Sequence, residues 1–179
     1  LGGFHDADEE KLFKDRGTKM LQRIIDNPGI ILNKAVKLSS PDSLPPRYYL
    51  SEDENIILCG KIDWLEHNPS DNSIHIIDFK TGKNEEGKNS LQLPIYYLLV
   101  KNLQKRSIKK ASYWYLDKND RPDEIQLPDA KDAFERVFDI AMKVKQTRTT
   151  KSYYCPRNGC YACRPECLRP ASFKCPCRL

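Results

Sequence analysis

Apolar and polar positions along the chain predict alternating helices and strands. Three segments repeat apolar side chains at helical spacing: residues 8–26, 90–104 and 129–147. Four shorter runs either alternate or are rich in β-branched and aromatic residues: residues 30–38, 55–65, 73–80 and 111–116. The predicted order is therefore α-β-β-β-α-β-α, which belongs to the α/β fold class.

The loop between the second and third predicted strands has the composition of a turn, Pro69-Ser70-Asp71-Asn72. A turn at these positions predicts a β-hairpin in which the numbers of paired residues add up to 141. Asp63 then lies directly opposite Asp78 on one face, with Cβ atoms about 5 Å apart. Two opposed carboxylates repel each other, so we expect a shared proton or a divalent cation between them.

Lys80 lies two positions after Asp78 and therefore projects from the same strand face. Two acids and a lysine around a cation suit phosphodiester hydrolysis, because the metal polarises a water and the lysine orients it or stabilises negative charge. The alternative is a pair of solvated acids beside a surface lysine. The catalytic interpretation is favoured because Asp63 and Asp78 each stand between apolar neighbours, where a polar residue needs a reason.

Charge is unevenly distributed along the 179 residues, which carry 30 Lys and Arg against 25 Asp and Glu. Residues 143–179 hold nine basic residues and a single acid, Glu166. This segment suits a polyanionic partner, or else it is a solvated basic terminus. No apolar run approaches the roughly 20 residues of a bilayer span, which argues against a membrane protein. The chain begins at Leu1, so we expect a fragment or processed chain lacking an upstream segment.

Six of the seven cysteines lie between Cys155 and Cys177. Local clustering favours a metal centre in a reducing compartment over a secreted disulfide framework, so we expect an intracellular protein. Four thiolates can reach one centre, either tetrahedral zinc or a [4Fe–4S] cluster, and spacing alone does not choose between them: Cys155, Cys160, Cys163 and Cys167. We therefore divide the chain into a core, residues 1–150, and a Cys-rich metal or iron–sulfur tail, residues 151–179.

Three ordered motifs carry a resemblance to a known family: Gly60-Lys61-Ile62-Asp63, Ile77-Asp78-Phe79-Lys80-Thr81-Gly82 and Leu91-Gln92-Leu93-Pro94-Ile95-Tyr96. Over roughly residues 8–117 the chain resembles the PD-(D/E)XK nucleases, and within them the RecB-like branch, with the nuclease domains of RecB and AddB and the CRISPR adaptation exonucleases. The resemblance implies a restriction-endonuclease-like αβββαβ core with a mixed central sheet. Each motif alone is weak, but their order around a predicted hairpin and helix is specific.

The resemblance also implies roles for individual residues. Asp63 and Asp78 would hold Mg²⁺ or Mn²⁺ with the Phe79 carbonyl as a further ligand, and Lys80 would activate water. Gln92 and Tyr96, four apart on one helix face, would bind DNA and complete the site. The plainer alternative for this last pair is a packed tyrosine and a surface glutamine. One position departs from the family, because Leu21 stands where many relatives carry a metal-binding histidine on the first helix.

Iron–sulfur relatives use such a tail to hold the C-terminus on the core, and the fourth ligand of their cluster lies upstream of the first helix. In this chain either Cys155 takes the place of the fourth ligand, or that ligand was lost with the missing upstream segment. Cys175 and Cys177 are further candidates for cluster ligands.

The expected function is a metal-dependent deoxyribonuclease, an exonuclease in DNA repair, recombination or foreign-DNA processing. Its expected partners are single-stranded DNA or DNA ends and a fused or separate helicase, in the cytoplasm or, in a prokaryote, at the nucleoid. The alternatives are a catalytically silent DNA-binding or helicase-bracing domain with a structural iron–sulfur or zinc site, and a zinc-ribbon-like interaction module with coincidental hairpin acids.

Overall fold

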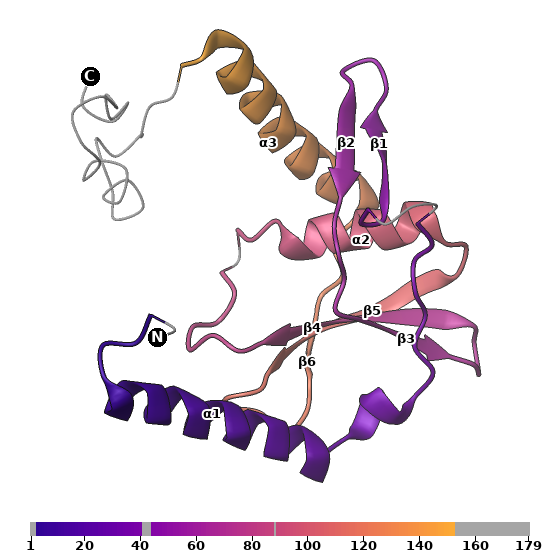
Figure 1. The fold of residues 1–179 in the computed structure, drawn as a ribbon. Helices are drawn as coiled ribbons and strands as arrows, with labels where there is room; N and C mark the ends of the chain where they lie inside the picture. Colours follow the sequence, from indigo (N-terminus) through magenta and orange to yellow (C-terminus); the bar gives the residue numbers. More distant parts are fainter. Residues whose placement is uncertain (1–2, 41–43, 88, 153–179) are drawn as a thin grey trace, which may run out of the picture. The chain divides into compact units, whose positions relative to one another are not determined.

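The computed structural model describes residues 3–40, 44–87 and 89–152 (Figure 1). The chain divides into two units, residues 1–137 and 138–179. Within the described residues the elements follow one another in this order: α1 (Ala7–Asp26), a 3₁₀ helix η1 (Gly29–Leu32), β1 (Arg47–Ser51), β2 (Ile56–Cys59), β3 (Trp64–Asn68), β4 (Ser73–Lys80), α2 (Gln92–Leu103), β5 (Ser107–Tyr115), β6 (Asp123–Ile125) and α3 (Ala130–Thr150).

The central sheet is mixed, with strand order β3-β4-β5-β6. The β3 and β4 strands are antiparallel, β4 and β5 are parallel, and β5 and β6 are antiparallel. The predicted hairpin register is confirmed, because Trp64 pairs with Ile77 and Asn68 with Ser73 around the turn at residues 69–72. The fold is therefore the mixed α/β fold that the sequence predicts.

Helices cover both faces of this sheet (Figure 1). On one face, Ile74 and Ile76 of β4 form a buried cluster with Val100 of α2. On the other face, Ile77 of β4 forms a second cluster with Met20 of α1. Alternate residues of β4 thus point into two separate cores, as the period of a strand requires.

The first helix is held by charged residues at its N-terminus and near its middle. Its N-cap is Asp6, whose side chain accepts a hydrogen bond from the backbone N–H of Glu9. Further along, Arg16 forms an ion pair with Asp117 at 3.0 Å and donates to the carbonyl of Thr81, directly after β4. The helix is thereby tied to the end of the strand that carries Asp78.

Residues 30–38 are not the strand that their alternation predicts. The segment begins in the 3₁₀ helix after Pro28, and its only contact of sheet type in the described residues is an isolated bridge between Ala35 and Glu66. The alternation has another cause, since Val36 and Leu38 both pack against the cluster around Ile74. An extended segment at the edge of a sheet can therefore pack every second side chain against the core without forming a strand.

The predicted strand 55–65 is interrupted. Its first half is β2, which pairs with β1 in a separate two-stranded sheet that the pattern did not predict. Its second half is the beginning of β3, and Gly60 lies between the two. A Cβ atom on Gly60 would lie 2.8 Å from Cδ1 of Leu99 in α2, so a side chain at this position would require the buried Leu99 side chain to move.

Candidate active site

Asp63 and Asp78 meet at the end of the β3–β4 hairpin. Asp63 directly precedes β3, and its Oδ2 accepts a hydrogen bond of 3.0 Å from the backbone N–H of Phe79. This bond places its carboxylate at the end of β4, where the hairpin register, continued one residue beyond the Trp64–Ile77 pair, puts it opposite Asp78. Asp63 is exposed, whereas Asp78 is only 3% exposed. One acid of the pair is therefore buried and the other is accessible.

Burial is the main influence on the charge of Asp78. It raises the pKa of the Asp78 carboxyl above its ordinary value, and the neighbouring charge of Asp63 acts in the same direction. The Lys80 ammonium opposes the shift but does not cancel it. Without a further positive charge nearby, keeping Asp78 ionised therefore reduces the stability of the folded state.

The two oxygens of Asp78 have different partners, and one of them keeps acceptor capacity. Oδ1 accepts a bond of 2.8 Å from Gln92 Nε2, whereas Oδ2 is buried and has Lys80 Nζ at 2.9 Å as its partner in the described residues. A buried carboxylate oxygen with free acceptor capacity fits a hard divalent cation. No group of three or more His, Cys, Asp and Glu side chains in the described residues is arranged to hold a metal. The side-chain donors available at this position are therefore the two carboxylates.

Lys80 lies at the centre of the polar side chains. Its Nζ contacts Asp78 Oδ2, Glu86 Oε2 at 2.8 Å and Gln92 Oε1, and it lies 5.0 Å from the centre of the Tyr113 ring. Burial would lower the pKa of Lys80, but the hydrogen bonds and charges of Glu86 and Asp78 outweigh burial and raise it. Lys80 is therefore a cation at neutral pH and cannot act there as a general base.

Gln92, the first residue of α2, bridges the acid and the lysine. Its Nε2 donates to Asp78 Oδ1, and its Oε1 faces Lys80 Nζ. One turn later, Tyr96 has its hydroxyl 3.1 Å from Gln92 Nε2, and burial raises the pKa of this hydroxyl. The five side chains proposed from the sequence, Asp63, Asp78, Lys80, Gln92 and Tyr96, thus lie together.

Glu86 belongs to the same cluster but was not predicted from the sequence. It lies in the connection between β4 and α2, and its backbone N–H donates to the Tyr115 hydroxyl at 2.9 Å. The pKa of its carboxyl is lowered chiefly by the hydrogen bond with Lys80 and then by one with Ser90. In the sequence it stands beside Glu85 in a charged loop, where such acids are usually solvated.

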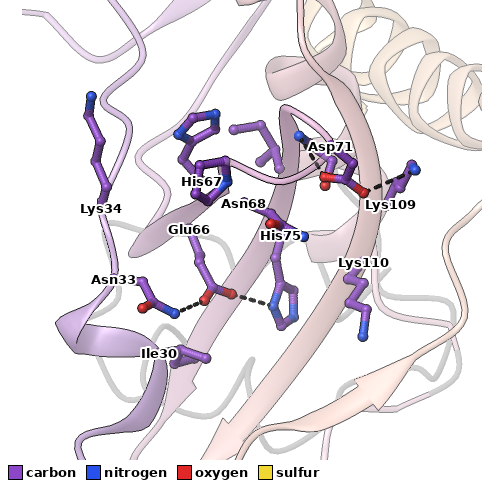
Figure 2. Close-up of a pocket in the computed structure, with 13 residues that line it drawn as sticks. Ile30, Asn33, Lys34, Glu66, His67, Asn68, Asp71, His75, Lys109 and Lys110 are labelled. Atoms are coloured by element: carbon purple, nitrogen blue, oxygen red, sulfur yellow. Dashed lines mark hydrogen bonds and ion pairs between the residues drawn. The ribbon is translucent and has the colours of Figure 1, made fainter.

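A second polar cluster occupies the opposite face of β4, where Figure 2 shows Glu66 between Asn33 and His75. His75 Nδ1 lies 2.9 Å from Glu66 Oε2, and its Nε2 lies 2.8 Å from Ser112 Oγ. These contacts connect β3, β4 and β5, beside a cavity of about 600 Å³ at the hairpin end. His75 is three residues from Asp78 on the same strand, so its side chain points away from the candidate site.

Among the described residues, Leu21 and Cys59 add no ligand to the site. Leu21 is 64% exposed on α1, so its side chain is solvated rather than packed. Cys59 is exposed in β2, while the proposed cluster ligands Cys155, Cys160, Cys163 and Cys167 lie outside the described residues. Among the helices of the described residues, none is long and apolar enough to cross a bilayer.

Comparison with known proteins identifies the family. None of the curated proteins matches the chain. The family model described as the PD-(D/E)XK nuclease superfamily matches residues 7–169, which include the hairpin acids, the lysine and the first helix. This match covers most of the 179 residues, and the chain belongs to the PD-(D/E)XK nuclease superfamily.

Proposed function

We propose that this chain is a metal-dependent DNA nuclease of the RecB-like branch, an exonuclease that hydrolyses phosphodiester bonds in DNA repair, recombination or foreign-DNA processing. The observation that carries the proposal is the buried Oδ2 of Asp78. Among the described residues its partner is the Lys80 ammonium, which leaves acceptor capacity on this oxygen, and it belongs to a carboxylate opposite that of Asp63. Without a cation this arrangement destabilises the fold, whereas a bound cation would take the two carboxylates as ligands.

Asp63 and Asp78 would hold Mg²⁺ or Mn²⁺, which members of this superfamily typically use, with the Phe79 carbonyl as the further ligand that the resemblance suggests. When bound, such a cation polarises the phosphodiester and lowers the pKa of a water molecule. The lysine, a fixed cation, would orient that water and stabilise the charge that develops on the phosphate.

Gln92 and Tyr96 would keep these groups in place. Because one amide contacts both Asp78 Oδ1 and Lys80, the distance between acid and lysine is fixed before substrate arrives. The hydroxyl of Tyr96 limits the rotation of that amide from the next turn of α2. Such prior positioning reduces the entropy lost in reaching the transition state.

DNA is the proposed substrate because of the charge distribution as well as the family. Residues 143–179 carry nine basic groups against one acid, and the first four, Lys143, Lys145, Arg148 and Lys151, lie in α3 or directly after it. Basic side chains of this kind bind phosphates without reading sequence, and their contribution to affinity falls as salt rises. A helicase partner would supply single strands or ends, which we propose as the substrate form.

The test is digestion of end-labelled single-stranded and double-stranded DNA with Mg²⁺ or Mn²⁺, beside a closed circle. An exonuclease degrades the linear substrates and spares the circle. Asp78→Asn removes the proposed ligand charge, and Asp53→Asn makes the same change in the exposed turn after β1 as a matched control. The proposal requires cleavage by the parent chain and the control and its loss in Asp78→Asn.

A catalytically silent DNA-binding domain is the second candidate, and Leu21 favours it. The hydrocarbon side chain at this position cannot ligate a cation, and its exposure leaves the carboxylate pair as the cation's side-chain ligands. DNA binding without cleavage under any divalent cation would identify this function. Restoration of cleavage by Leu21→His would then assign the silence to this single position.

A further inference from the structure

The ammonium group of Lys80 is already surrounded. Three oxygen atoms of the described residues contact its Nζ, from Asp78, Glu86 and Gln92. An ammonium group has three N–H bonds, so a fourth oxygen enters only if one of the three leaves. In this arrangement Lys80 cannot meet a phosphate or orient a water.

Glu86 is the contact that can leave. The Asp78 side chain is 5% exposed on a central strand, and Gln92 is held by Asp78 and Tyr96 together. The Glu86 side chain is 27% exposed and lies in the connection between β4 and α2. Removing its carboxylate from Lys80 breaks one accessible ion pair and leaves the other two contacts intact.

The carboxylate of Glu86 also has the chemistry of the proposed ligand. It presents two equivalent oxygens with one negative charge, as the non-bridging oxygens of a phosphodiester do, and it binds both Lys80 and the Ser90 hydroxyl. A phosphate in its place would inherit the same cation and the same hydroxyl. It would also lie next to the Asp78–Asp63 pair.

We propose that the Glu86 carboxylate occupies the binding position of a backbone phosphate of the nucleic acid, and that substrate binds by displacing it from Lys80. This inference rests on the proposed function and adds to it a phosphate subsite formed by Lys80 and Ser90. Glu86 is then a built-in competitor, whose negative charge weakens the binding of every nucleic acid that enters. Removing that charge strengthens nucleic-acid binding even where no cleavage takes place.

The test measures binding without catalysis. A fluorescently labelled single-stranded oligonucleotide is titrated by anisotropy in EDTA over a range of salt concentrations. Glu86→Gln should bind about fivefold tighter than the parent chain, the value of one partly exposed ion pair. The slope of log K against log salt should change little, because Lys80 contacts one phosphate in the complexes of both chains.

The matched control is Glu85→Gln, which removes the same charge from the neighbouring position. Glu85 is exposed and pairs with Lys118 at 3.2 Å, away from Lys80. Glu86→Ala, which also lacks the carboxylate, should reproduce the effect of Glu86→Gln, and circular dichroism checks that each variant is folded. The inference is overturned if Glu86→Gln binds more weakly than the parent, or no more tightly than Glu85→Gln.

Failure of the proposed function gives a different result. If Glu86→Gln shows the tighter binding but the parent chain never cleaves DNA with any divalent cation, the phosphate subsite is supported and the nuclease assignment is wrong. If the parent cleaves DNA and Glu86→Gln binds like Glu85→Gln, the assignment stands and the subsite is wrong.

Discussion

Asp78→Asn is the substitution with the most informative expected consequences, because the structure predicts opposite effects with and without a cation. Without a cation, the variant loses the buried charge and its repulsion with Asp63, and it also loses the ion pair with Lys80 at 2.9 Å. The raised pKa of Asp78 shows that burial and repulsion outweigh the attraction. The variant should therefore be more stable, by about 0.2–1 kcal/mol for two directly opposed like charges.

The added stability of Asp78→Asn should increase from acid to neutral pH. Since folding raises the pKa of Asp78, protonation favours the folded parent chain, and that advantage is complete below the ordinary carboxyl pKa and lost as pH rises through the raised one. The difference between variant and parent is therefore small in acid and largest near neutrality. Urea unfolding in EDTA at several pH values measures it.

With Mg²⁺ the order of stability should reverse, so that the parent chain is more stable than Asp78→Asn. A cation that binds only the folded parent adds about 2.7 kcal/mol at one hundred times its dissociation constant, which exceeds the gain of the variant. Cleavage by Asp78→Asn should be lost in the same buffer. The reasoning is refuted if Mg²⁺ stabilises the variant as much as the parent, or if the variant cleaves DNA undiminished.

Three further results are expected. Lys80→Ala should lower the cleavage rate at least ~100-fold with little loss of cation affinity in calorimetry, and Lys80→Arg should rescue poorly; equal losses of rate and affinity would make the lysine structural. Gly60→Ala should reduce the free energy of unfolding by about 1–3 kcal/mol, because the new Cβ meets Leu99; unchanged urea unfolding would contradict this close approach. Replacing Cys160 and Cys163 by Ser should remove bound metal, expose the C-terminal segment to protease and weaken DNA binding at moderate salt, and an unchanged digestion pattern and affinity would argue against a metal centre. A brown parent sample would indicate iron–sulfur and a colourless one zinc or no metal.

The hairpin could be predicted because turn chemistry and strand period act locally. Once the turn at residues 69–72 is fixed, counting along two strands places Asp63 opposite Asp78, and no long-range information is needed. The same holds for Lys80, two residues further along one strand. Gln92 could be placed only through the family motif, because the angle at which α2 meets β4 is set by packing against Ile76 and its neighbours.

The parts that pattern reading missed depend on contacts distant in the sequence. The alternation in residues 30–38 has the correct period, but whether Val36 lies in a strand or beside one depends on the partners that β3 offers. Glu86 could not be predicted for a similar reason, since an acid in a loop belongs to the site only if the fold places it beside Lys80. Local sequence specifies the elements here, and tertiary contacts decide which polar side chains share a site.

The bridge made by Gln92 limits which amino acid can stand at the start of α2. That position must offer a donor to Asp78 and an acceptor to Lys80 from the end of one side chain. Only a carboxamide carries both groups on one carbon: a glutamate would face the aspartate with a second negative charge, and a lysine or arginine would have nothing to accept with. Asparagine has the right group but is one methylene shorter. An engineer who moves this site onto another scaffold therefore has to transfer the glutamine with the acids and the lysine, because the ordinary exchange of glutamine for glutamate would reverse the sign of one of its two contacts.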